Sequence, residues 1–176
     1  YSSAASDVYK RQIVPDYAKF MREGSKFLQL EPPKDIYEAI NSLLIFYKNV
    51  PSVTNFPVYL GNIDELLEPF MDDVDEAQAK KLFKLFFTHI DRTVLDSFSH
   101  ADIGPKATRA GRLILEVERE LLDAVPNITM KYDTDITPDD FGIECVKTAL
   151  KTAKPSFANH KMFKKELGEN YVIASF

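Results

Sequence analysis

Asn127, Thr129 and Lys131 alternate with apolar residues in the stretch PNITMKY, which has the composition of a short β-strand. Because successive side chains of a strand point to opposite faces, an amide, a hydroxyl and an ammonium group would share one face. An unsatisfied buried polar group costs about 1–3 kcal/mol, so that face must meet water, a polar network or a substrate. The stretch is either an edge strand with one hydrated face or a barrel strand that faces a substrate pocket.

Lys131 has two interpretations within this pattern. Its ammonium group can pair with an anionic group of a substrate or with a neighbouring acidic side chain. The spacing of the residues does not choose between the two.

Three further residues are candidates for the same pocket. Thr54 and Asn55 lie in VTNFPVYLGN. This stretch is either a core strand whose polar residues lie at its edge, or a strand that presents the hydroxyl of Thr54 and the amide of Asn55 to a ligand. His100 lies in SHADIGP, which we interpret as a loop of small and turn-forming residues. Loops held by rigid elements often carry function, so His100 either lines a site or caps this loop.

Other kinds of site have little support in the sequence. The six glycines do not form a phosphate-binding loop, and the lone Cys145 can form neither an internal disulfide nor a cysteine cluster for a metal. The acidic residues between Asp133 and Asp140 lack calcium-loop spacing and fit helix capping better. We therefore expect no bound metal.

Composition favours a soluble protein of the cytoplasm. The formal net charge of -5 disfavours nucleic acid and anionic membranes as partners. No apolar run approaches the roughly 20 residues that span a bilayer. A single cysteine suits a reducing compartment.

Periodicity predicts an α/β fold that is predominantly helical, with a few short strands. Thr137 is expected to cap its helix at the N-terminus, with Pro138 at the first helical position. Long helical crossovers between strands favour parallel pairing in an incomplete sheet or barrel. The helices are expected at 16–30 (broken near Gly24), 36–49, 63–69, 72–98, 106–124, 137–153 and 160–167, and the strands at 52–62, 127–132 and 171–176.

Both ends of the chain are unusual. Residues 1–12, YSSAASDVYKRQ, resemble the translated adapter sequence that contaminates environmental sequence assemblies, so we expect them not to be native. The last residues, ENYVIASF, stop within an expected strand. We therefore expect residues 13–176 to be the N-terminal part of a longer barrel domain.

Five blocks of the sequence carry a resemblance to a known family: IVPDYAKFMREGSKFLQL, VPSVTNFPVYLGNIDELLEPF, DRTVLDSFSHADIGP, PNITMKYDTDITPDDF and ENYVIAS. In this order they resemble the YjjI family of glycyl radical enzymes, which is similar to pyruvate formate-lyase. The resemblance covers nearly all of the chain from Ile13 onward.

The resemblance implies a ten-stranded α/β barrel and a radical reaction on a small organic substrate. In such enzymes a glycyl radical near the C-terminus generates a thiyl radical on a buried cysteine, which abstracts hydrogen from the substrate. An S-adenosylmethionine activase with an iron–sulfur cluster installs the glycyl radical. The chain itself is then expected to bind no cofactor, to belong to anaerobic metabolism and to be inactive as a fragment, and a homodimer remains open.

The resemblance also places the radical cysteine at position 176, where this sequence has Phe176. A phenyl ring cannot form a thiyl radical, and Cys145 lies within an expected helix, where a cysteine usually serves packing. The catalytic residues are therefore unknown from this sequence. Two alternatives to this function remain. The first is a non-catalytic helical interaction or scaffold domain, in which helices 36–49, 75–95 and 106–124 pack together. The second is a formate acyltransferase like pyruvate formate-lyase.

Overall fold

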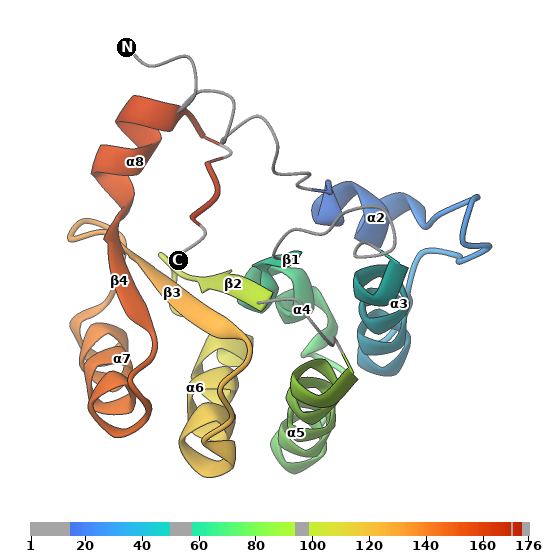
Figure 1. Cartoon of the computed structure of the whole chain (residues 1–176), viewed down its shortest axis with the longest axis horizontal. Helices are drawn as coiled ribbons and strands as arrows, with labels where there is room; N and C mark the ends of the chain where they lie inside the picture. Colours follow the sequence, from blue (N-terminus) through green and yellow to red (C-terminus); the bar gives the residue numbers. More distant parts are fainter. Residues whose placement is uncertain (1–14, 50–57, 94–98, 170, 174–176) are drawn as a thin grey trace.

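The computed structural model describes residues 15–49, 58–93, 99–169 and 171–173. These residues form an α/β fold in which strands and helices alternate along most of the chain (Figure 1). The elements are α2 (Tyr17–Glu23), α3 (Ile36–Asn49), β1 (Val58–Asn62), α4 (Ile63–Leu67), the 3-10 helix η1 (Glu68–Phe70), α5 (Glu76–Thr93), β2 (Ser99–Ile103), α6 (Arg109–Leu121), β3 (Asn127–Tyr132), α7 (Asp139–Thr152), β4 (Ser156–Asn159) and α8 (His160–Leu167).

The four described strands form one parallel sheet in the order β1-β2-β3-β4, so each new strand is added at the same edge. Figure 1 shows α3, α5, α6 and α7 side by side along one face of this sheet. Helix α8 and the segment Tyr171–Ile173 lie on the opposite side. A sheet wound in one direction keeps its crossover helices on one face, as the walls of α/β barrels do.

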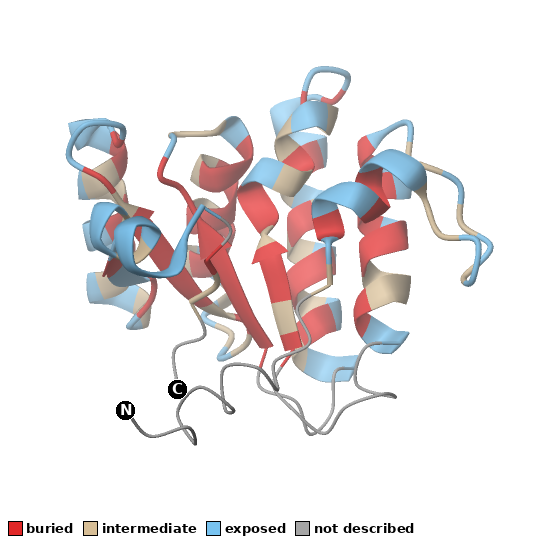
Figure 2. Ribbon diagram, turned by 90° about the horizontal axis from the view of Figure 1, so that it is seen from above, coloured by how far each residue is buried: buried red, intermediate tan, exposed pale blue. Residues whose placement is uncertain are grey.

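The hydrophobic core lies between the sheet and this helical layer. Apolar strand residues such as Leu60, Ala101 and Ile128 pack there against the buried stripe of α5, which includes Phe83 and Phe86. In Figure 2 strands β1, β2 and β3 carry mainly buried residues, whereas α8 is largely exposed. Burying a Leu or Phe side chain contributes about 1.5–3 kcal/mol, so this layer supplies much of the folding free energy.

Several predicted elements are confirmed. Helix α3 has the predicted bounds, and the carboxylate of Asp35 accepts a hydrogen bond from the Glu38 backbone N–H at 2.8 Å, as expected of an N-cap. Strand β3 also has the predicted bounds. Helix α2 ends at Glu23 beside the predicted break at Gly24, which adopts a positive φ of 70°, but residues 25–30 form turns between two bridge residues and not the expected helix. No helix in the described ranges is long and apolar enough to cross a membrane.

The interpretation of SHADIGP as a loop is wrong, because its first five residues are strand β2. All five are buried, and Ala101 and Ile103 pack in the core. Small polar residues resemble a loop in the sequence, but they also fit a strand that is covered on both faces.

Three other expectations about local structure need correction. Strand β4 has only four residues and no clear pattern in the sequence, so the sheet has four described strands and not three. Thr137 does not cap α7: Pro138 holds the N-cap position, and the Thr137 hydroxyl donates to the Pro105 carbonyl at 2.8 Å. Tyr171–Ile173 is not a strand, and residues 174–176 lie outside the described ranges.

Asp64, in the first turn of α4, joins the carboxyl ends of β1 and β2. Its Oδ2 accepts hydrogen bonds from the Gly104 backbone N–H and from the Thr108 hydroxyl, each at 3.0 Å. The side chain is fully buried, and burial raises the pKa of Asp64 to about 7. Within the described residues its Oδ1 accepts no hydrogen bond, which suits a carboxyl group that keeps its proton.

We predict that the contribution of Asp64 to the free energy of unfolding falls as the pH rises from about 4 to about 7. In this range the folded protein holds a proton on Asp64 that the unfolded chain, with a pKa near 3.8, has released. The variant Asp64→Asn cannot titrate, so its stability should change less between pH 5 and pH 7 than that of the wild type. The expected difference amounts to about 2 kcal/mol over this interval, measured by urea unfolding.

Asp135→Asn is the matched control. Lys161 lowers the pKa of the exposed Asp135, so its carboxylate stays ionised across the interval and the slope of stability against pH should not change. Equal slopes for Asp64→Asn and the wild type would contradict the assignment of a retained proton to Asp64.

Candidate functional site

The polar face predicted for strand β3 exists and is buried. Thr129 and Lys131 are 3% and 7% exposed, while Ile128 and Met130 point the other way into the core. Strand β3 pairs with β2 on one side and β4 on the other. The interpretation as an edge strand with a hydrated face is therefore wrong, because β3 is an interior strand with both faces covered.

Strand pairing extends this polar face onto the neighbouring strands. His100 is in register with Asn127, and Asp102 is in register with Thr129, so these side chains share one face of the sheet. On the other side the Thr129 and Ser156 hydroxyl oxygens lie 3.1 Å apart, within hydrogen-bond distance. The sheet thus presents a continuous row of polar groups on the face opposite the helical layer.

The structure brings together four of the six predicted pocket residues: His100, Asn127, Thr129 and Lys131. The other two, Thr54 and Asn55, lie outside the described residues, as does Phe176. His100 belongs to β2 and not to a loop, and burial lowers its pKa, which favours the neutral imidazole near pH 7.

Lys131 forms an ion pair with Asp102 at the centre of this face. The Lys131 Nζ lies 3.0 Å from Asp102 Oδ2, and both side chains are buried. The Tyr59 hydroxyl donates to the same carboxylate oxygen at 2.8 Å. Burial raises the pKa of Asp102, and the nearby ammonium group of Lys131 acts in the opposite direction. Of the two partners considered for Lys131, the structure supplies the neighbouring acid.

Tyr171 covers this ion pair from the C-terminal segment. The Lys131 Nζ lies 4.8 Å from the centre of the Tyr171 ring, and the ring centres of Phe163 and Tyr171 stack 5.7 Å apart. The Tyr171 hydroxyl oxygen lies 2.6 Å from His160 Nδ1. These contacts from α8 hold the Tyr171 ring over β3.

Three residues that complete this cluster are not predicted by the sequence patterns: Tyr59, Asp102 and Tyr171. Asp102 lies in a segment whose small residues resemble a loop, and Tyr59 lies in an apolar stretch. A two-residue alternation of His100 and Asp102 with Ala101 and Ile103 is the signal that could have found Asp102. No comparable pattern predicts the position of Tyr171, which only the fold brings over β3.

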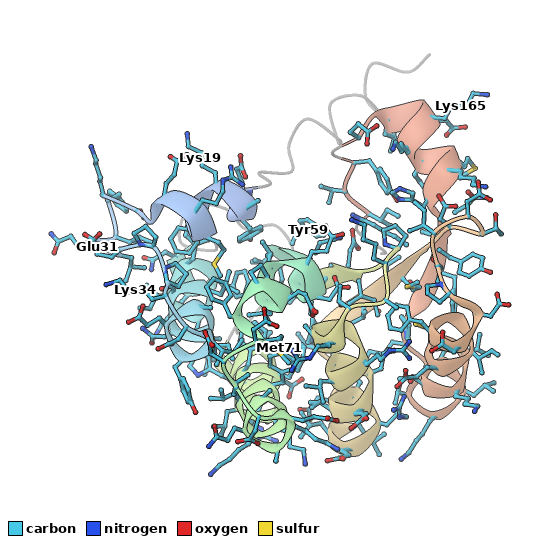
Figure 3. All side chains as sticks on the ribbon, turned by 180° about the vertical axis from the view of Figure 1, so that it is seen from behind. Lys19, Glu31, Lys34, Tyr59, Met71 and Lys165 are labelled. Atoms are coloured by element: carbon cyan, nitrogen blue, oxygen red, sulfur yellow. The ribbon has the colours of Figure 1, made fainter. Side chains whose placement is uncertain are left out.

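A cavity of about 950 Å³ opens at the carboxyl ends of the strands, beside this cluster. Residues at or just after the ends of all four strands contribute to its wall, and Figure 3 shows Tyr59 on the side of the sheet that faces α2 and the C-terminal segment. Ligand sites of parallel α/β sheets are found at this end of the strands. The lining side chains with polar groups include Asp16, Tyr17, Tyr59, Asn62, Glu65, Lys131, His160, Glu169 and Tyr171.

Cys145 lies away from this cavity, on the core-facing side of α7. It is fully buried, and burial raises the pKa of its thiol to about 12. A protonated thiol among apolar neighbours is a packing group. Within the described ranges no cluster of three or more His, Cys, Asp or Glu side chains is arranged to hold a metal ion.

We predict that Lys131→Met lowers the free energy of unfolding by about 3–5 kcal/mol, because it leaves the Asp102 carboxylate buried without its cation. The double variant Asp102→Leu/Lys131→Met should be more stable than Lys131→Met, since it removes both charges. Urea unfolding followed by circular dichroism measures both effects.

Lys161→Met is the matched control for this pair. Lys161 forms ion pairs with Asp133 and Asp135, but its side chain is 48% exposed. Its loss should cost less than about 1 kcal/mol. Similar unfolding midpoints for the wild type and Lys131→Met would show that the buried pair does not stabilise the sheet.

Comparison with known proteins identifies the family. The sequence model described as "Glycyl radical enzyme YjjI-like" matches residues 3–176. An uncharacterized protein from Haemophilus influenzae is 48% identical over 165 residues, which are 94% of this chain and 32% of that protein. The uncharacterized protein YjjI from Escherichia coli is 43% identical over 149 residues, which are 85% of this chain and 29% of that protein. The chain spans about a third of the length of these curated relatives, and it belongs to the YjjI-like family of glycyl radical enzymes.

Proposed function

We propose that this chain is the N-terminal part of a longer glycyl radical enzyme that abstracts hydrogen from a small organic substrate. In this proposal a glycyl radical and a thiyl radical elsewhere in the enzyme perform the abstraction, and the polar face of the sheet lines part of the substrate pocket. The observation that carries the proposal is the buried polar face beside a cavity at the carboxyl ends of the strands, in a chain of this family.

The winding of the sheet supports its place in a barrel wall. All four described strands are parallel and follow one another in order, and the crossover helices lie on a single face. The inner face of such a wall is the face that can surround a substrate. His100, Asp102, Thr129 and Lys131 lie on that face.

The outer surface of α7 supports the proposal that the wall continues. Ile143, Val146 and Leu150 form an apolar stripe on α7 and are 54%, 47% and 84% exposed. Phe157 on β4, the last strand of the described sheet, is 46% exposed. Apolar patches of this kind mark surfaces that another segment covers. We propose that the covering segment belongs to the two-thirds of the relatives' length that this chain does not span.

The charges on the polar face suit radical chemistry in a closed site. A reactive intermediate survives longer where water is excluded, and the pairing of Lys131 with Asp102 avoids an isolated charge that would draw water in. A radical S-adenosylmethionine activase would be the protein partner, and an oxygen-free cytoplasm the setting. The acyl transfer of pyruvate formate-lyase is an alternative reaction within this proposal, and a homodimer is compatible with it.

The described architecture differs from a helical bundle. Helices α3, α5 and α6 pack in one layer, as the scaffold alternative expected, but the layer rests on a parallel sheet. No surface among the described residues favours a non-catalytic role over the enzymatic one.

The proposal predicts a glycyl radical in the protein extended to the length of its relatives. After anaerobic incubation with the activase and S-adenosylmethionine, electron paramagnetic resonance should show the doublet of a glycyl radical. The chain of residues 1–176 serves as the control and should give no doublet under the same conditions. An extended protein that contains the glycine loop yet gives no doublet would refute the proposed chemistry.

A further inference from the structure

We propose that the cavity binds a small neutral or positively charged compound that donates hydrogen bonds, such as an alcohol or an amino alcohol, in preference to a carboxylate or phosphate. This inference rests on the proposed function in one respect, namely that the cavity is part of the substrate pocket. It concerns the class of compound that the pocket accepts.

The positive charge in the wall of the cavity is already neutralised. Among the described residues that line the cavity, Lys131 is the one Lys or Arg side chain, and Asp102 pairs with it at 3.0 Å. The Tyr171 ring also covers the ammonium group. An anionic ligand would therefore have to compete with a buried carboxylate for the only lysine in the described wall.

The acidic side chains of the wall outnumber this neutralised lysine. Asp16, Glu65 and Glu169 line the cavity, and Lys164 pairs with Glu169 at 3.0 Å. Asp16 and Glu65 remain as exposed negative charges, at the N-terminal ends of α2 and α4. Their charge repels anions and attracts cations, and the tyrosine rings of the wall suit cations as well.

Two buried oxygen atoms that lack donors point independently to the same class of ligand. Asn62 and Asp102 are in register at the ends of β1 and β2. Within the described part of the chain, Asn62 Oδ1 and Asp102 Oδ1 have no hydrogen-bond partner. The backbone N–H of Ile173 acts on the Asp102 carboxylate and lowers its pKa, but it forms no hydrogen bond to Oδ1.

The orientation of the Asn62 amide is fixed by its neighbour. Asn62 Nδ2 donates to the Gly104 carbonyl at 3.0 Å, and a flipped amide would place two acceptors against each other. The side-chain atom of Asn62 that lacks a hydrogen-bond partner is therefore its oxygen, Oδ1. Two acceptors without donors at adjacent strand ends call for hydroxyl or ammonium groups and not for the oxygens of an anion.

Asn62 lines the cavity, so its Oδ1 is the acceptor that a ligand in the cavity can approach. Tyr59 also lines the cavity, and its hydroxyl donates to Oδ2 of Asp102, which does not line it. In the proposal a ligand hydroxyl or ammonium group donates to Asn62 Oδ1, and a ligand group that displaces the Tyr59 hydroxyl also reaches the Asp102 carboxylate.

Three compounds of matched size test the proposal: 2-aminoethanol, ethane-1,2-diol and glycolate, which at pH 7 are cationic, neutral and anionic. Binding to the extended protein without activation is measured by saturation-transfer difference nuclear magnetic resonance. We expect 2-aminoethanol and ethane-1,2-diol to bind at least tenfold more tightly than glycolate. Glycolate binding as tightly as the diol, or no binding by any of the three, would overturn the proposal.

Variants assign the binding to the cavity. Asn62→Leu should weaken binding of the diol about tenfold, and Glu65→Gln, at an exposed position, should weaken binding of 2-aminoethanol a few-fold while leaving the diol unchanged. Asp135→Asn is the matched control for Glu65→Gln, because it also removes an exposed acid but Asp135 does not line the cavity. If Asn62→Leu fails to fold, Glu65→Gln still decides: equal binding of 2-aminoethanol by this variant and the wild type would overturn the role of the acidic wall.

Failure of this inference can be distinguished from failure of the proposed chemistry. Binding is recorded on unactivated protein, so it does not depend on a glycyl radical. A protein that forms the radical but prefers glycolate would retain the proposed function and refute the inference.

Discussion

The ion pair between Asp102 and Lys131 is the constraint on which the polar face of the sheet depends. It joins β2 to β3 with two buried charges 3.0 Å apart, and Tyr59 from β1 donates to the same carboxylate oxygen. A buried ammonium group or carboxylate is costly to keep alone, so each residue requires the other. Because the two charges neutralise each other, the sheet can carry these polar side chains at buried positions.

The polar face links the fold to the proposed chemistry. The helical layer and the apolar strand residues stabilise one side of the sheet, and this leaves the other side available for polar groups. The cavity lies where the strands end and where the segment Tyr171–Ile173 crosses the polar face. In our proposal, the pairing that neutralises Lys131 also makes the cavity suit a donor of hydrogen bonds in place of an anion.

Parts of the fold follow from local sequence patterns. Helix α3 and strand β3 have the predicted bounds because their apolar spacing matches the period of each element. Strands β2 and β4 were not predicted. The sequence of β2, SHADI, is rich in small polar residues, and β4, SFAN, has only four residues. Burial between β1 and β3 makes SHADI a strand, whereas SFAN becomes a strand by pairing with β3 although three of its four residues are exposed.

The sequence by itself determined that Asn127, Thr129 and Lys131 share a face, because alternation in a strand is a local property. It also indicated the family, which the comparisons show. Only the tertiary structure decided that Lys131 pairs with Asp102 and that the Tyr171 ring lies over the Lys131 ammonium group, since these contacts join residues that are distant in the chain. The order of the strands in space creates such contacts, and no local pattern encodes that order.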